Sequence, residues 1–162
     1  MIVSSIYALI ATLCFGVLSN IRGRDLIFSS IGGGITWFIY LLTFHYFHSS
    51  IIFAYFMASL IGSLYSEIMA RVLKTPVTSF VIGAIIPLVP GGGMYNTMFE
   101  TVQGNIDGSI ETGIQTLAIA GTIAVGVFSV SSISKAYILF KRKIHMQKLK
   151  IMKNKFKTNN SR

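Results

Sequence analysis

PLVPGGG, residues 87–93, interrupts an apolar run that extends from Val77 to Phe99. The run is long enough to cross a bilayer, which takes about 20 residues of helix. Because proline removes a backbone donor and clashes with the preceding turn, and glycine gives the backbone wide freedom, we do not expect one continuous helix here. Backbone groups freed at this depth must face protein or a water-filled cavity rather than lipid. Transporters bind polar substrates at such broken membrane helices.

The whole chain has the composition of an integral membrane protein. Of its 162 residues only 12% are charged, against about 25% in soluble domains, and its mean hydropathy is +0.67. We therefore expect an all-α fold, a bundle of five transmembrane helices of which the fourth is broken between Pro87 and Gly93. The expected spans are Ile2–Asn20, Leu26–Phe47, Ile51–Ala70, Val77–Phe99 and Gly113–Ser134.

The net charge of +9 is distributed in a way that indicates membrane orientation rather than nucleic-acid binding. The 14 Lys and Arg residues fall at 22–24, at 71–74 and from Lys135 onwards, whereas residues 100–111 carry three acids and no basic residue. With the N-terminus outside, five spans put every Lys and Arg on one side of the membrane. A four-span arrangement would put one basic loop on the wrong side. We therefore expect a cytoplasmic C-terminus and no nucleic-acid partner.

The second half of the broken helix is expected to begin near Gly91. A helix N-terminus has backbone N–H groups without intrahelical partners and about half a positive charge, so it suits a carboxylate or a phosphate. The expected substrate-binding residues are Gly91, Gly92, Gly93, Tyr95, Asn96 and Thr97, and the residues that hold the break are Pro87 and Pro90. The alternative is a proline kink that only shapes helix packing.

Glu67 is the single acidic residue inside the third expected span, near its cytoplasmic end. Acidic residues within a membrane are costly and often functional. Two roles are open: Glu67 pairs with Arg71 at the i, i+4 spacing and completes the helix, or it binds protons in coupled transport. Glu67 also continues a helix face that carries Ser59 and Ser63, which either packs against another helix or lines a path.

The sequence contains no convincing catalytic or cofactor-binding pattern. The single cysteine, Cys14, excludes an intrachain disulfide and a cysteine-based zinc site. The glycines at 32–34 are not followed by the Lys-Ser or Lys-Thr pair of a phosphate loop, and no nucleophile elbow or zinc-protease motif occurs. We therefore expect no cofactor, no metal site and no enzymatic activity.

The C-terminal segment, residues 141–162, is basic and contains no acid. Such a segment can lie on an anionic inner leaflet, at about 1 kcal/mol per basic residue near the surface. We expect it to be a cytoplasmic tail that follows a transmembrane domain at residues 1–140, and we expect its first role to be the orientation of the protein. Membrane lipid is therefore an expected partner.

The run from Ile86 to Met98 resembles the signature of the threonine/serine exporter family. It is most similar to the second half of that exporter, which in many bacteria is a separate small membrane subunit. The similarity covers about Ala8 to Phe140, and the other segments that carry it are Phe15–Leu18 with Asn20 and Arg22, Trp37 with Tyr40, Phe56–Ala58, and Ser66–Arg71 with Pro76. Asn96 departs from the pattern because relatives often have an aromatic residue there, which bears on the substrate contacts.

The resemblance implies a subunit of a secondary transporter in the bacterial inner membrane. Such a subunit exports threonine and serine, or a dicarboxylate such as succinate, and the proton gradient is the expected driving force. The resemblance also implies a larger partner subunit that carries the first half of the exporter, or self-association into a homo-oligomer. Both substrate classes carry a carboxylate, which suits the helix N-terminus near Gly91.

Two other functions stay open from the sequence. A non-transporting scaffold subunit would stabilise a partner membrane protein, and its loss would lower the abundance of the partner rather than its turnover. A membrane enzyme acting on lipid would need a catalytic acid, base or metal set, which the sequence does not offer.

Overall fold

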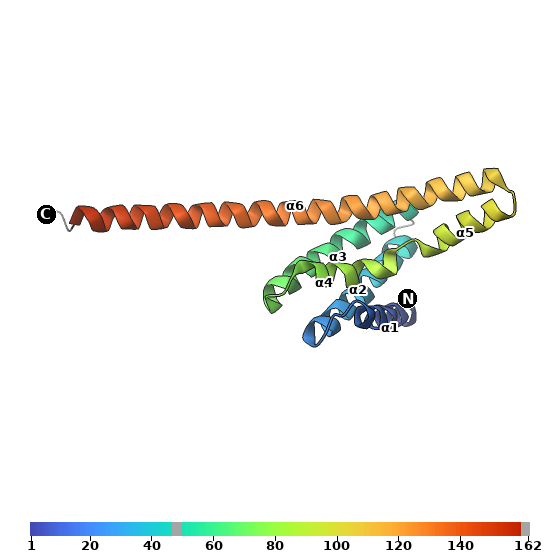
Figure 1. Ribbon diagram of the computed structural model, residues 1–162, viewed down its shortest axis with the longest axis horizontal. Coiled ribbons are helices and arrows are strands. Elements are labelled where there is room, and N and C mark those ends of the chain that lie inside the picture. The colour runs from blue at the N-terminus through green and yellow to red at the C-terminus, as the bar shows by residue number, and fades with distance from the viewer. Residues whose placement is uncertain (47–49, 160–162) are drawn as a thin grey trace. The chain divides into compact units, whose positions relative to one another are not determined.

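The computed structural model describes residues 1–46 and 50–159, with side chains described for these residues through 137 and at 139–141, 143 and 146. Over this part of the chain the fold is all-helical, with no strand (Figure 1). The elements are α1 (Ile2–Leu18), α2 (Arg24–Tyr46), α3 (Ile51–Leu73), α4 (Val77–Ile85), the short 3₁₀ turn η1 (Ile86–Leu88), α5 (Gly91–Val102) and α6 (Ile106–Asn159). The chain divides into two compact units, Met1–Val130 and Ser131–Arg162.

In the part of the chain that the structure describes, three helices are long and apolar enough to cross a membrane: α2, α3 and the part of α6 from Ile106 to Lys141. The pair formed by Val77–Leu88 and Gly91–Val102 meets the same test as one broken span, with a bend of 51° between its halves. The remaining helix, α1, is apolar but shorter. The interruption that the sequence predicts between Pro87 and Gly93 is therefore present in the structure.

The first and third helices end close to the expected positions, and both ends have local causes. Helix α1 stops at Leu18 because Asn20 adopts a left-handed conformation, with φ of 59°. Helix α3 begins after Ser50, whose hydroxyl accepts a hydrogen bond from the amide of Phe53 at 3.4 Å, and it closes at Lys74, which is also left-handed. At both ends an amide beyond the left-handed residue donates to a carbonyl oxygen of the last turn, from Ile21 to Gly16 at 2.9 Å and from Thr75 to Ala70 at 3.1 Å, so carbonyls that the helix end leaves free are satisfied.

The other bounds differ more from the expected spans. Helix α6 starts at Ile106 rather than Gly113, because the Asn105 side chain accepts a hydrogen bond from the amide of Gly108 at 3.2 Å and so caps a polar first turn. The same helix continues past Ser134 to Asn159. The expected end of the second span, Phe47, lies outside the described residues.

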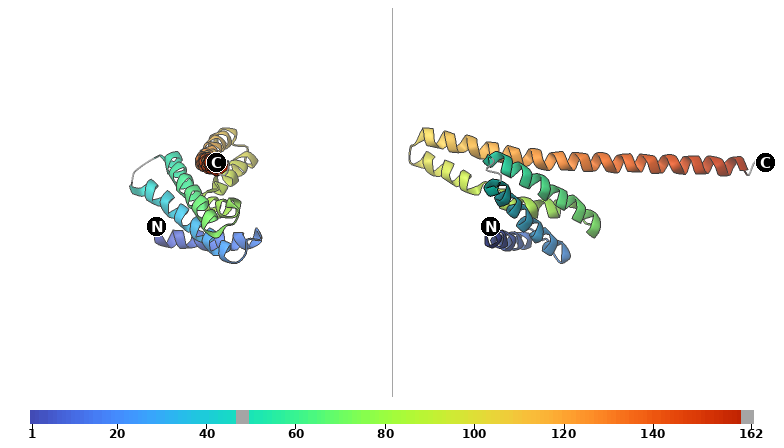
Figure 2. Two further views of the ribbon diagram at one scale, coloured as in Figure 1. Left: turned by 90° about the vertical axis from the view of Figure 1, so that its left-hand side faces the viewer. Right: turned by 180° about the vertical axis from the view of Figure 1, so that it is seen from behind.

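Within the first unit, α2 is the central helix and contacts α1, α3, α4 and η1 (Figure 2). Small residues allow these contacts. A side-chain carbon at Gly33 would collide with Thr12 of α1 and would lie 2.9 Å from the carbonyl oxygen of Gly83 in α4. At Gly62 of α3, such a carbon would lie 2.7 Å from the Thr36 hydroxyl of α2. Close backbone approach of this kind is how helices associate in lipid, where the hydrophobic effect gives little drive.

The part of α6 that belongs to the first unit packs on α3 and η1. Ala58, Leu88, Ile119 and Ile123 form one buried apolar cluster. Further along the same two helices, a side-chain carbon at Gly126 would collide with the Ser59 side chain. The interrupted segment is thus joined to the bundle through Leu88, which is fully buried.

Candidate functional site at the interrupted helix

The interruption exposes the backbone at the start of α5. Pro90 occupies the N-cap position of α5, and the amide of Gly91 donates to the carbonyl oxygen of Val89 at 2.7 Å. The first bond of the helix runs from the amide of Met94 to the carbonyl oxygen of Pro90 at 3.1 Å. Helix geometry therefore leaves the amides of Gly92 and Gly93 without an intrahelical acceptor. This pair carries most of the positive end of the α5 dipole.

The start of α5 has one open side and one packed side. A side-chain carbon placed at Gly91 or Gly92 would have no heavy atom within 4 Å. A carbon placed at Gly93 would collide with the side chain of Thr116 in α6. A ligand can therefore approach the backbone from the side of Gly91 and Gly92, while Gly93 holds α5 close against α6.

The three polar residues expected to orient a substrate are divided between these two sides. Tyr95 and Asn96 are exposed, and the Tyr95 ring stacks on that of Phe99 with centroids 6.0 Å apart. Thr97 lies on the packed side, where its side chain would be 3.3 Å from a carbon at Gly113. Its hydroxyl already donates to the carbonyl oxygen of Gly93 at 2.8 Å. Tyr95 and Asn96 are thus better placed than Thr97 to offer polar groups to a ligand.

Helix α5 and the start of α6 form a hairpin held by polar contacts. The hydroxyl of Ser109 donates to the carbonyl oxygen of Thr97 at 3.1 Å and lies 2.6 Å from the hydroxyl of Thr101. At the turn, the side-chain nitrogen Nδ2 of Asn105 donates to the Glu100 carboxylate at 2.7 Å. Although these contacts fix α5 on α6, none of the twelve residues of α5 is buried.

The residues of α6 that support this hairpin were not among the expected site residues. They are Ser109, Gly113 and Thr116, which lie at the i, i+4, i+7 spacing of one helix face. That spacing is visible in the sequence, but only the structure shows that this face of α6 packs against Gly93 and Thr97 of α5. Thr116 is buried, and its hydroxyl donates to the carbonyl oxygen of Thr112 at 2.7 Å.

Glu67 is buried in α3, and its carboxylate lies 3.5 Å from the Arg71 guanidinium. The i, i+4 ion pair expected from the sequence is therefore present. One and two turns before Glu67 on the same helix are Ser63 and Ser59, both fully buried. Ser59 donates to the carbonyl oxygen of Phe56 at 2.8 Å, whereas among the described residues the Ser63 hydroxyl has no hydrogen-bond partner.

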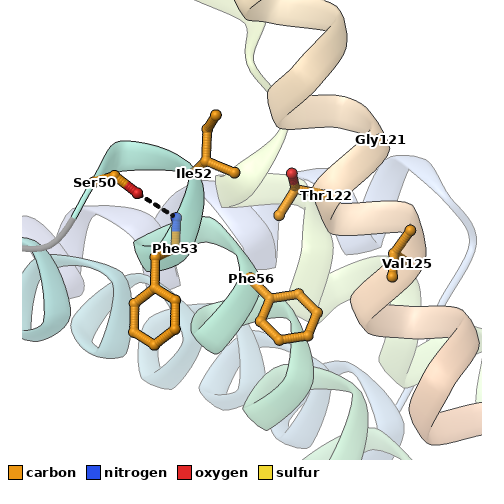
Figure 3. A pocket seen from close by; sticks show the side chains of 7 residues that line it. All are labelled: Ser50, Ile52, Phe53, Phe56, Gly121, Thr122 and Val125. Carbon is orange, nitrogen blue, oxygen red and sulfur yellow. Dashed lines mark hydrogen bonds between the residues drawn. The ribbon is translucent and has the colours of Figure 1, made fainter.

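A separate groove of about 500 Å³ lies between the start of α3 and the middle of α6 (Figure 3). Its walls are mainly apolar: Ile52, Phe53 and Phe56 on α3 and Val125 on α6. Its two hydroxyl groups make hydrogen bonds within their own helices. That of Ser50 accepts from the amide of Phe53, and that of Thr122 donates to the carbonyl oxygen of Ala118 at 2.8 Å. This groove is therefore a poorer place for a charged solute than the start of α5.

Metal ligands do not gather anywhere in the described part of the chain: no group of three or more His, Cys, Asp or Glu side chains could hold an ion there.

A family model described as "Threonine/Serine exporter, ThrE" matches residues 4–133. The matched region contains α1 to α5, the interruption and the part of α6 that packs on α3. No curated protein and no solved structure gives a significant match to the chain.

Proposed function

Because the chain belongs to the threonine/serine exporter family, we propose that it is the smaller subunit of a secondary transporter that exports small metabolites bearing a carboxylate. Family membership and three helices suited to crossing a bilayer make it a multi-pass membrane protein and a component of an exporter. We further propose that the exported metabolites are threonine and serine, or a dicarboxylate such as succinate. We propose that the proton gradient drives this export.

The observation that carries this proposal is the open start of α5. The amides of Gly92 and Gly93 lie at the positive end of a helix, where they can donate to one carboxylate. The space around Gly91 and Gly92 is unoccupied, and the exposed side chains of Tyr95 and Asn96 follow on the next turn. A zwitterionic amino acid and a dicarboxylate both present the anionic group that this arrangement recognises. Pro87 and Pro90 keep the helix from closing over it.

The same proposal includes the arrangement of the chain in the membrane. We propose five spans, with α1 as the first and the two halves of the broken helix together as the fourth. The N-terminus then faces outside and the basic residues face the cytoplasm of a bacterial inner membrane. Residues 1–140 form the exporter half-domain, and residues 141–162 form the cytoplasmic tail.

A partner subunit is supported by the exposed face of α5. A helix that lies at membrane depth with Asn96 exposed would place an amide against lipid, which is costly. A larger subunit that carries the first half of the exporter would cover this face and complete the site. A second copy of this chain is the alternative occupant.

Transport assays in proteoliposomes that contain both subunits test the site. Gly92→Leu fills the open side of α5, and we expect it to reduce uptake of radiolabelled threonine, serine or succinate by at least about tenfold, because a blocked anion contact costs more than 1.4 kcal/mol. The matched control is Gly121→Leu, since a side-chain carbon at Gly121 also meets no heavy atom within 4 Å. Full transport by the Gly92→Leu protein would count against the site.

The scaffold function makes a different prediction in the same cells. If the chain only stabilises its partner, deletion lowers the amount of the larger subunit, and the Gly92→Leu variant restores both that amount and transport. If the chain forms part of the site, the variant restores the amount of the partner but not transport. Quantitative immunoblotting of the partner separates the two outcomes.

Proton coupling through Glu67 is the second part of the proposal, and it competes with a purely structural ion pair to Arg71. Glu67→Gln keeps the shape of the side chain and removes its charge. We expect this variant to retain substrate exchange at equal pH and to lose acceleration by an imposed pH gradient. The control is Glu111→Gln, an exposed acid of α6. A Glu67→Gln protein that is merely less stable, with its pH response intact, would leave Glu67 as a structural residue.

A further inference from the structure

The last helix has an apolar surface on several sides just before its basic segment begins. Tyr137 is 59% exposed, and Leu139 and Phe140 are each 65% exposed. Consecutive helical positions are separated by about 100°, so these three residues cover different sides of the helix. An apolar surface on all sides is stable in hydrocarbon but not in water. This part of the helix therefore belongs inside the bilayer, in agreement with the candidate span that ends at Lys141.

The charge of the helix changes within one residue. Phe140 is followed by Lys141, Arg142 and Lys143, and five further lysines occur between 148 and 157. The exposed side chains of Lys141 and Lys143 lie directly after the exposed apolar residues. No acidic residue occurs after Glu111, so no carboxylate of this helix neutralises the segment. A boundary this sharp places residues 141–143 at the depth of the lipid headgroups.

We propose that residues 141–157, here called the cationic segment, bind the headgroups of anionic phospholipids in the leaflet where the last spanning helix ends. Lys141 and Lys143 are separated by about 200° around the helix, so a protein surface on one side could neutralise only one of them. A headgroup layer surrounds the helix and can meet both.

The charge density of the segment also favours lipid over nucleic acid as the ligand. An anionic leaflet lies directly against residues 141–143, whereas a nucleic acid would have to approach that leaflet against repulsion. This inference depends on α6 crossing the membrane and not on the substrate of the exporter. A failed transport assay would therefore leave it standing, and its own failure would leave the site at α5 standing.

The test uses the full chain in lipid nanodiscs with an environment-sensitive fluorophore at position 146. Met146→Cys in a Cys14→Ser background gives one labelling site, since Met146 is exposed and Cys14 is the only cysteine. With phosphatidylglycerol present, we expect emission shifted to the blue and a shift that added salt reverses. In phosphatidylcholine alone we expect no shift. Equal emission in the two lipids would overturn the proposal without the use of any charge variant.

Charge variants then assign the effect to the segment. Replacement of Lys141, Arg142 and Lys143 by Gln should raise the phosphatidylglycerol fraction needed for half the shift, because each basic residue near an anionic surface adds up to about fivefold in affinity. Three such losses amount to as much as about a hundredfold. Lys141→Arg with Lys143→Arg preserves the charge and should behave as the parent. A shift produced by single-stranded RNA in phosphatidylcholine discs, and not by phosphatidylglycerol, would instead identify a nucleic-acid ligand.

Discussion

Single glycines decide how closely the helices of the first unit approach. Gly83 of α4 lies against α2 at Ser29, where a side-chain carbon would collide with the Ser29 hydroxyl and lie 2.9 Å from its carbonyl oxygen. The same serine donates to the carbonyl oxygen of Ser79 at 3.0 Å, which joins the two helices. A backbone oxygen cannot move aside as the end of a long side chain can. Any residue other than glycine at 83 must therefore push α4 away from α2.

We expect Gly83→Ala to lower the free energy of unfolding by about 1–3 kcal/mol, the range for overpacking a tight contact. The comparison is Gly121→Ala, which adds the same methyl group in open space and should raise helix stability by up to about 1 kcal/mol. Thermal unfolding of the purified proteins in one detergent measures both. Equal loss in the two variants would mean that the α2–α4 contact does not limit packing.

Ser63 differs from the other buried hydroxyl-bearing residues of the helices. Thr36 and Ser66 donate to the carbonyl oxygens of Gly32 and Gly62 at 2.7 Å, and this bond removes the cost of their burial. The Ser63 hydroxyl is as deeply buried but has no partner among the described residues. A buried hydroxyl without a bond costs about 1–3 kcal/mol.

Ser63→Ala should therefore leave the protein equally stable or stabilise it by about 1 kcal/mol, because it removes an unmet donor. Ser66→Ala removes a satisfied hydroxyl of the same helix and should cost about 0.5–1.5 kcal/mol. Denaturant titration in detergent compares the two directly. A Ser63→Ala protein that is clearly less stable than Ser66→Ala would indicate that Ser63 holds a water molecule or a ligand.

At the scale of elements, α5 stands apart from the other helices. It is a twelve-residue helix without a buried residue, started by proline and glycine rather than by a capping side chain. A Ser, Thr or Asp cap would occupy the amides to which the proposed site binds a carboxylate. Helix α5 is thus stabilised mainly by its hairpin with α6, and its opposite face is exposed.

The left-handed residue at the C-terminus of α3 allows the cost of its backbone conformation to be measured. Lys74 closes the helix in a left-handed conformation with φ of 56°, which costs a residue with a side chain about 1 kcal/mol. Lys74→Gly removes that strain and should stabilise the protein by up to about 1 kcal/mol, whereas Lys74→Ala should not. Both variants remove the same charge, so the difference between their unfolding temperatures isolates the backbone term.

At the scale of the whole molecule, the proposed orientation depends on which loops carry basic residues. The connection after α1 contains Arg22 and the start of α2 contains Arg24, while the turn between α5 and α6 is flanked by Glu100 and Asp107. If the interrupted helix crosses as one span and α6 as another, these two connections lie on opposite sides and the C-terminal lysines lie on the side of the first; the proposed five spans with the N-terminus outside satisfy this condition. The interrupted helix must then count as one span.

Cysteine accessibility tests this arrangement. In a Cys14→Ser background, Gln103→Cys should react with a membrane-impermeant maleimide on intact spheroplasts, and Ser19→Cys should react only after permeabilisation. Both positions are exposed in the structure. The reverse pattern would mean that the protein has the opposite orientation, and labelling of both positions only after permeabilisation would mean that the interrupted helix re-enters the membrane without crossing it.

The sequence alone determined the helical content, the approximate bounds of the first four expected spans, the interruption at Pro87–Gly93 and the family, which the family match confirms. These features depend on neighbouring residues: hydropathy sets a span, and proline with glycine ends a helix wherever the rest of the chain lies. The Glu67–Arg71 pair was predictable for the same reason.

Only the tertiary structure decided which side of α5 is open. From the sequence, Thr97 and Asn96 were both expected to bind the substrate. In the structure Thr97 lies against Gly113, whereas Asn96 is exposed. The sequence also could not show that the Ser63 hydroxyl, on a helix face of small residues, has no hydrogen-bond partner among the described residues. Such differences depend on the rotation of each helix about its axis, which is set by contacts between residues far apart in the chain. Local sequence patterns do not determine that rotation.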